Sequence, residues 1–328
     1  MVLRELPKID YGAHPLYGGM FEPNPHLGER ARQLLEPLVQ QSTEDERQRA
    51  EKFGYRYSWR DELTRELAQD GAACRQLPGA AIDEIAAAAQ PIVDVVQARL
   101  RATRAAGLPL KYKTALEPVA QDGGDLWGAV DRALAEAGLY EATATVFDAP
   151  SARLRSVGVL VNHAQQEWAT RLYRDVEVEA PPTAGFHIDS DCKCFTKIVL
   201  YLTDVGAEQG PFGVAPGSHR WGEGGQDRIF RSAFDRSPLV VRSAKLRRRF
   251  LSLPPQMQTK AEFGGDMLPG SPEAQALVAE ERVMTGPRGQ LNLFNPDAIH
   301  RGGNVRSGER QVLLISIGPR WNPPAPAL

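Results

Sequence analysis

His187 and Asp189 are candidate metal ligands that are separated by one residue. On a β-strand, side chains two residues apart leave the same face, so this imidazole and this carboxylate would point toward one position. A third donor, His300, follows the segment Leu291 to Ile299. Two histidines and one carboxylate form the facial triad of non-haem iron(II) sites, which leaves positions open on the metal. We predict that His187, Asp189 and His300 are the metal-binding and catalytic residues.

Asp191 lies on the same alternation as Asp189 and competes with it for the role of carboxylate ligand. Two residues of strand add ~6.6 Å, which is too far for a donor that must share a metal with His187. We therefore predict Asp189 as the ligand. Asp191 is expected to bind substrate or to cap a turn.

Arg310 comes ten residues after His300 and is followed by the apolar run Val312 to Ile317. A planar guanidinium matches a carboxylate, so an arginine on a strand beside the metal could hold the far carboxylate of a keto acid bound to that metal. Arg301, Arg306 and Arg320 are nearby rivals, but only Arg310 starts an apolar strand. The four residues together indicate a 2-oxoglutarate-dependent oxygenase.

The C-terminal half of the chain resembles the phytanoyl-CoA dioxygenase-like family. The motifs that carry the resemblance are Phe186-His187-Ile188-Asp189, Lys197 to Asp204, Gly210-Pro211-Phe212, Pro216-Gly217-Ser218-His219, His300 to Asn304, and Arg310. The resemblance implies a double-stranded β-helix (jelly-roll) core, Fe(II), 2-oxoglutarate as co-substrate, and oxidation of a small molecule. One position departs from the family pattern: Gly302 stands where many relatives have a Ser or Thr that contacts the keto acid.

Further co-substrate contacts are implied by the same resemblance. In the family, the strand that follows the metal loop contributes a contact to the keto acid, which makes Tyr201 and Thr196 candidates. Asn162 is a candidate of the same kind. Core packing is the alternative role for Tyr201, and a fixed turn is the expected role of His219.

The expected activity is hydroxylation of a small molecule, an amino acid or secondary metabolite, by O2 with release of succinate and CO2. Asp189 argues against a halogenase, in which halide takes the place of the carboxylate. The alternative is a non-catalytic or non-redox metal-binding protein of the cupin type, which has no need for an arginine at position 310. The sequence does not indicate which small molecule is the primary substrate.

Composition excludes several other classes of function. The 328 residues contain 39 basic and 41 acidic side chains and a net charge of −2, so nothing indicates nucleic acid or an anionic membrane as a partner. Three cysteines form no disulfide framework, and the N-terminus lacks the apolar core of a signal peptide, which favours the cytoplasm. A zinc site at Cys192 and Cys194 lacks a matching second pair. The basic run Lys245 to Arg249 is expected to be a solvated helix face rather than a phosphate site.

The order of helix-like and strand-like segments predicts an α+β enzyme, mainly β with added helices. We expect an irregular arm and a helical part over residues 1–140, packed on a jelly-roll core over residues 141–328. Residues 220–286 are expected to form a lid-like insertion in this core. The predicted helices and strands are 59–70, 82–104 and 126–138, and 144–147, 154–161, 170–178, 197–202, 289–294 and 311–318 respectively.

Overall fold

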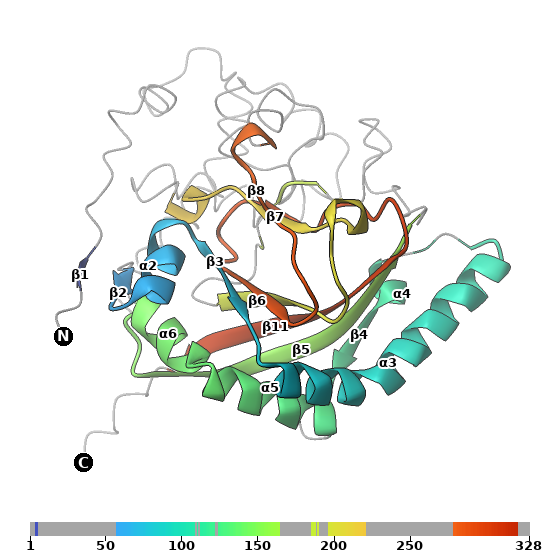
Figure 1. Ribbon diagram of the computed structural model, residues 1–328, viewed down its shortest axis with the longest axis horizontal. Helices are drawn as coiled ribbons and strands as arrows, with labels where there is room; N and C mark the ends of the chain where they lie inside the picture. The colour runs from blue at the N-terminus through green and yellow to red at the C-terminus, as the bar shows by residue number, and fades with distance from the viewer. Residues whose placement is uncertain are drawn as a thin grey trace, which may run out of the picture.

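Antiparallel β-structure forms the centre of the protein in a computed structural model, drawn in Figure 1. The structure describes residues 4–5, 57–108, 110, 112–121, 124–164, 185–187, 189, 196–220 and 278–320. A six-stranded sheet has the order β3-β9-β6-β11-β5-β4, and a three-stranded sheet has the order β10-β7-β8. The strands of the larger sheet are β3 (Ala72–Gln76), β4 (Leu116–Val119), β5 (Ser151–His163), β6 (Thr196–Tyr201), β9 (Gln290–Phe294) and β11 (Glu309–Arg320). Those of the smaller sheet are β7 (Phe212–Val214), β8 (Arg282–Met284) and β10 (His300–Arg301), and β1 (Arg4–Glu5) pairs with β2 (Ser58–Trp59).

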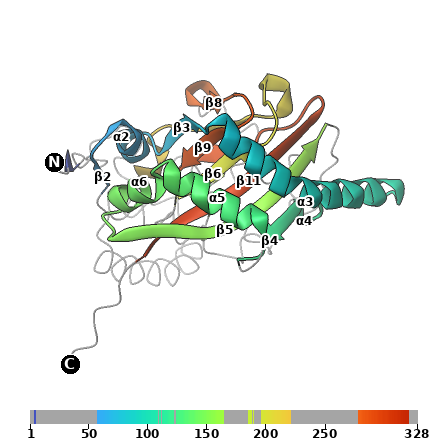
Figure 2. The ribbon, with the colours of Figure 1, turned by 60° about the horizontal axis from the view of Figure 1, so that its bottom comes forward.

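Helices cover one face of the larger sheet, as Figures 1 and 2 show. They are α2 (Glu62–Gln69), α3 (Gly79–Ala105), α4 (Tyr112–Ala115), α5 (Asp125–Glu136) and α6 (Leu139–Val146), with 3-10 turns at Ala207–Gln209 and Ser218–Arg220. The longest of them, α3, buries Ile85, Val93 and Val96 at helical spacing. Pro91 lies inside α3 without dividing it. Among the described residues, no helix has the length and hydrophobicity needed to cross a lipid bilayer.

The two faces of the larger sheet have different surroundings. The outer face, which the helices cover, carries Thr196, Ile198 and Leu200 of β6 and their pairing partners Ile317, Ile315 and Leu313 of β11, all buried. The inner face, which looks toward the smaller sheet, carries Lys197, Val199 and Tyr201 of β6 and Arg310 and Val312 of β11. Since the side-chain period of a strand is two, the apolar outer face fixes which residues point inward.

Most predicted elements are present in the described part of the chain. The structure contains the helices predicted within 59–70, 82–104 and 126–138 and the strands predicted at 154–161, 197–202, 289–294 and 311–318. The strand predicted at 144–147 was wrong, because these residues end α6 and bury Ala144 and Val146 on a helical face. Tertiary packing there overrides the strand preference of Thr and Val. The strand predicted at 170–178 lies outside the described residues.

Two strands of the larger sheet come from the N-terminal part of the chain. β3 pairs with β9 along one side of the sheet, and β4 pairs with β5 along the other. Neither strand has the apolar run that marks β11, and the sequence did not predict them. The division of the chain into two parts near residue 140 stays a prediction. Through β3 and β4, residues before this position belong to the same sheet as residues after it. The predicted insertion lies mostly outside the described residues, and its last part contains β8.

Candidate metal centre and co-substrate site

A short antiparallel bridge places the two candidate histidines side by side. The amide of His187 donates to the carbonyl of His300 at 2.8 Å, and the amide of His300 donates back at 2.9 Å. The amide of Asp189 donates to the carbonyl of Pro296 at 3.0 Å, which extends the contact toward the turn before β10. Asn295 stabilises that turn, because its side-chain oxygen accepts from the amide of Asp297 at 2.9 Å. Residues more than one hundred positions apart thus share one backbone frame.

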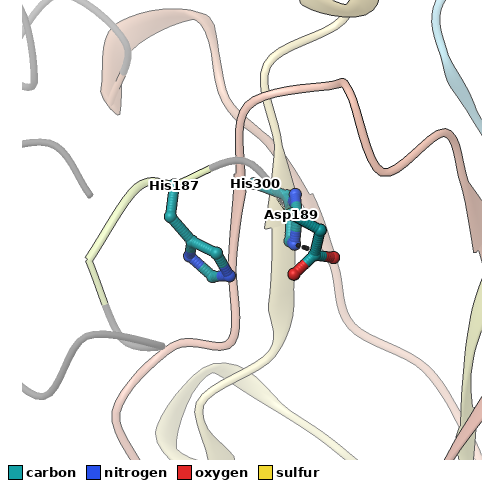
Figure 3. A group of neighbouring side chains, drawn as sticks. All are labelled: His187, Asp189 and His300. Carbon is teal, nitrogen blue, oxygen red and sulfur yellow. Dashed lines mark ion pairs between the residues drawn. The ribbon is translucent and has the colours of Figure 1, made fainter. Parts of the chain in front are cut away.

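The side chains of His187, Asp189 and His300 converge in front of this bridge, as Figure 3 shows. One potential ligand atom from each residue lies within 4.8 Å of the others. The two imidazole centroids are 4.3 Å apart, and His300 Nε2 lies 3.3 Å from Asp189 Oδ2. His300 is buried, whereas the other two are half-buried. The three residues of the predicted triad therefore lie together.

Both imidazoles are oriented by backbone carbonyls two residues earlier in the chain. His187 Nδ1 lies 3.0 Å from the carbonyl oxygen of Gly185, and His300 Nδ1 lies 2.8 Å from that of Ala298. An Nδ1–H that donates to a carbonyl leaves the lone pair on Nε2, which is the nitrogen that can bind a metal. Both rings have this arrangement, so each can offer a neutral imidazole nitrogen as a metal ligand. Two such imidazoles and one carboxylate form a donor set that suits a divalent ion.

Asp189 is held in its charged form by its neighbours. Burial raises the pKa of this carboxyl, but the imidazole of His300 and the ammonium of Lys197 outweigh it and bring the pKa well below its usual range. Lys197 Nζ lies 2.8 Å from Asp189 Oδ2. A carboxylate has two oxygens with several acceptor sites, so one contact with a lysine is compatible with metal binding. Asp189 is thus available as an anionic ligand at neutral pH.

An aromatic wall stands behind His300. Its ring centroid lies 4.5 Å from that of Phe294 and 5.7 Å from that of Phe212, and these two phenylalanines are 4.6 Å apart. Phe212 and Phe294 are both buried. An apolar wall lowers the local dielectric and strengthens the electrostatic interactions of the charged groups in front of it.

Arg310 is a buried cation on the inner face of the larger sheet. Its Nη2 donates to Asn162 Oδ1 at 3.0 Å across the β5–β11 pair, and its Nη1 donates to the carbonyl of Gly302. These two contacts come from β5 and from the loop after His300. The guanidinium is therefore fixed in direction from both sides, and the structure brings the predicted pair Arg310 and Asn162 together.

Comparison with known families gives a match for the region that contains this site. Residues 184–312 match the family model "Phytanoyl-CoA dioxygenase (PhyH)", and this range contains all three residues of the cluster and Arg310. The chain is thus similar to the phytanoyl-CoA dioxygenase family over these residues. It is an oxidoreductase that depends on Fe(II) and 2-oxoglutarate, as this family implies. No curated protein matches the sequence.

Three solved structures are similar to this chain at low sequence identity. AviO1 from Streptomyces viridochromogenes Tue57 is 16% identical, with 80% of this chain and 96% of that chain covered at a TM-score of 0.39. The carbocyclase SnoK from nogalamycin biosynthesis is 14% identical over 79% and 83% of the two chains at 0.42. EctD from S. alaskensis is 12% identical over 78% and 74% at 0.45.

Tyr201 of this oxygenase connects the two sheets. Its hydroxyl donates to the carbonyl of Met284 in β8 at 2.7 Å and accepts from the amide of Phe212 in β7 at 2.9 Å. Burial raises the pKa of this phenol to about 12, so it stays protonated and keeps both bonds. These contacts correspond to the packing role that the sequence left open beside co-substrate binding.

Thr196 is not brought to the cluster. It lies on the outer face of β6, and its hydroxyl is 3.0 Å from that of Thr143 in α6. Its neighbour Lys197 points inward to Asp189 instead. The sequence signal for Lys197 was available, because a lysine within a strand of apolar residues is unusual unless its charge is paired.

The remaining candidates lie elsewhere. Asp191, Cys192, Cys194 and residues 245–249 fall outside the described residues. Cys74 of β3 contacts Asn292 Oδ1 through its sulfur at 3.4 Å, and burial raises the pKa of this thiol. His219 contacts the carbonyl of Ala68 through Nε2 at 3.1 Å and packs edge-on against Tyr57, as a residue that fixes its turn would do.

Proposed function

We propose that His187, Asp189 and His300 are the three protein ligands of the Fe(II) ion. The observation that carries this proposal is their convergence within 4.8 Å, with the Nδ1 atom of both histidines directed to a carbonyl. Each residue contributes one donor, which leaves half of an octahedral coordination sphere for other groups. The ion pair between Lys197 and Asp189 keeps the carboxylate charged and limits its rotation before metal binds.

Arg310 is proposed to bind the distal carboxylate of 2-oxoglutarate. A guanidinium forms charge-assisted hydrogen bonds to a carboxylate, and a buried one does so without competition from water. Asn162 and the carbonyl of Gly302 hold two of its nitrogens, so its direction is set before the co-substrate arrives. Gly302 thus supports the arginine through its backbone, where many relatives carry a Ser or Thr.

The proposed reaction is hydroxylation of a small molecule. Bound Fe(II) and 2-oxoglutarate supply the oxidation by O2, which releases succinate and CO2. The chain itself orients the co-substrate through Arg310, keeps Asp189 anionic through Lys197, and excludes water behind His300 through Phe212 and Phe294. Orientation and exclusion of water are the contributions that a protein makes to such cofactor chemistry.

We further propose a jelly-roll core formed by the two sheets, and an amino acid or secondary metabolite as primary substrate. The antiparallel pairing of the two sheets and the position of the site between them support the first point. The second is a proposal from the sequence, whose balanced charge gives no indication of a macromolecular partner. A helical part over residues 1–140, an insertion at 220–286 and a cytoplasmic location remain proposals from the sequence.

Succinate release tests this function. The protein with Fe(II) and 2-oxoglutarate under air should release succinate slowly even without primary substrate. Asp189→Ala should abolish this release and the anaerobic binding of 2-oxoglutarate to the metal-loaded protein. Asp83→Ala, which removes a carboxylate at the surface that pairs with Arg288, is the matched control and should leave both unchanged. Metal binding without any succinate, in the native protein, would favour the non-redox alternative.

A further inference from the structure

A partly buried ion pair lies close behind the two histidines. Arg301 Nε donates to Glu281 Oε1 at 2.7 Å, and Arg301 Nη2 donates to Glu281 Oε2. The side chain of Glu281 is 3% exposed and that of Arg301 is 30% exposed. This is a two-point, fork-like contact, the most directional form of ion pair in proteins.

The guanidinium of Arg301 also stacks on the residue that precedes His187. Its Cζ lies 4.5 Å from the centre of the Phe186 ring, and Phe186 is buried. Arg301 follows His300, and Phe186 precedes His187, so each belongs to one side of the histidine bridge. Because neighbouring side chains on a strand leave opposite faces, the stack lies behind the bridge while the imidazoles lie in front.

The smaller sheet leaves room for this pair at Gly213. Gly213 of β7 pairs with Arg301 on one side and with Val283 on the other. A Cβ atom at residue 213 would lie 1.7 Å from Glu281 Oε1. The carboxylate of Glu281 is thus seated against the backbone of β7, which is possible only with glycine at this position.

We propose that Glu281, Arg301 and Phe186 are positioning residues for the metal centre. They tie both histidine strands to β7 and to the start of β8, so that the two imidazoles keep one separation and one tilt. A buried ion pair adds little net stability compared with apolar side chains of the same size. The role of this ion pair is to fix the direction of the two backbone segments that carry His187 and His300. The inference rests on the proposed metal site.

Metal affinity of the folded protein, measured with Mn(II) alone by EPR titration, tests the proposal. Glu281→Gln and Arg301→Lys should each weaken Mn(II) binding by ~10-fold or more, as expected when a residue that supports metal ligands is removed. With Co(II), the visible absorption of both variants should differ from that of the native protein, because this spectrum reports ligand geometry. Gly213→Ala, which leaves both charged residues in place but pushes the carboxylate away, should weaken Mn(II) binding in the same direction.

Two controls separate positioning from general destabilisation. Arg99→Lys alters a comparable ion pair, Arg99 with Glu117 at 2.5 Å, on the helical side of the sheet, and should leave Mn(II) affinity and the Co(II) spectrum unchanged. The double variant Glu281→Leu with Arg301→Met buries no charge, so it should fold even if the single variants do not. It should still bind Mn(II) ~10-fold more weakly.

Native Mn(II) affinity and a native Co(II) spectrum in the folded double variant would overturn the proposal. Failure of the metal site itself is distinguishable from this result. If Asp189→Ala binds Mn(II) as tightly as the native protein, the proposed function is wrong and the inference falls with it. If Asp189→Ala loses binding while the Glu281 and Arg301 variants keep it, only the positioning role is wrong.

Discussion

The outer and inner faces of the larger sheet differ in what their side chains do. On the outer face, Leu200, Leu291 and Leu313 are fully buried against helices. On the inner face, the same strands carry Lys197 and Arg310, whose charges are held by Asp189 and Asn162. The two sets alternate along each strand, so the apolar set determines the direction in which the functional set points. Stability and chemistry are therefore expected to respond to different residues of one strand.

The largest effect on stability is expected from the outer face. Leu313→Ala removes a fully buried side chain from the central strand β11 and should lower the free energy of unfolding by ~2–5 kcal/mol. The affinity for 2-oxoglutarate should stay native in the protein that remains folded. Urea unfolding and anaerobic calorimetry check both points. A large loss of co-substrate affinity would mean that the two faces are not separate in function.

On the inner face of the same strand, Arg310→Lys should affect binding instead. Lysine keeps the charge but loses the fork, so the affinity for 2-oxoglutarate should fall by ~10-fold or more, which corresponds to ~1.4 kcal/mol or more. The affinity for Mn(II) should not change, because the proposed role of Arg310 is to hold the co-substrate and not the metal. Anaerobic titration of the Mn(II)-loaded protein measures this. A proportional loss of metal affinity would contradict the assigned role.

Thr196→Val sharpens the comparison within β6. The change keeps the shape of the side chain but removes the hydroxyl that contacts Thr143, so unfolding should become easier by ~1 kcal/mol. Because Thr196 lies on the outer face, 2-oxoglutarate should bind with native affinity. Weaker co-substrate binding in a protein of native stability would restore the role that the family resemblance implied for this residue.

The smallest effect concerns pH and the pair His163–Glu309 at the end of β5. Burial lowers the pKa of His163 below its usual value, despite the opposing attraction of Glu309 at 3.1 Å. The unfolded chain therefore takes up this proton first as the pH falls, and the folded state loses stability from ~6.5 downward. His163→Gln should reduce that loss between neutral and mildly acidic pH. Thermal unfolding of both metal-free proteins in a pH series tests this, and identical pH profiles would show that His163 does not contribute.

Local sequence patterns predicted the three residues that converge, although none of the predicted strands carries them: His300 lies in the short strand β10 and His187 in an isolated bridge. The two-residue spacing of His187 and Asp189 and the apolar run after Arg310 are short-range signals, and both correspond to what the structure contains. The sequence placed Thr196 at the site, whereas the structure directs its neighbour Lys197 there, which is a difference of one residue along β6. A shift of one residue changes the face that a side chain takes, and in the structure Thr196 contacts Thr143 of α6 while Lys197 points inward to Asp189. Glu281 could not be predicted, since its partner Arg301 and its seat on Gly213 lie far from it in the chain.

The pairing of β3 with β9 and of β4 with β5 has a practical consequence for anyone who shortens this protein. A fragment that starts at residue 141 lacks both outermost strands and exposes the unpaired amides and carbonyls of β9 and β5. Edge strands with unpaired backbone groups readily pair with one another between molecules. Truncation at residue 141 would therefore favour aggregates over a smaller working enzyme.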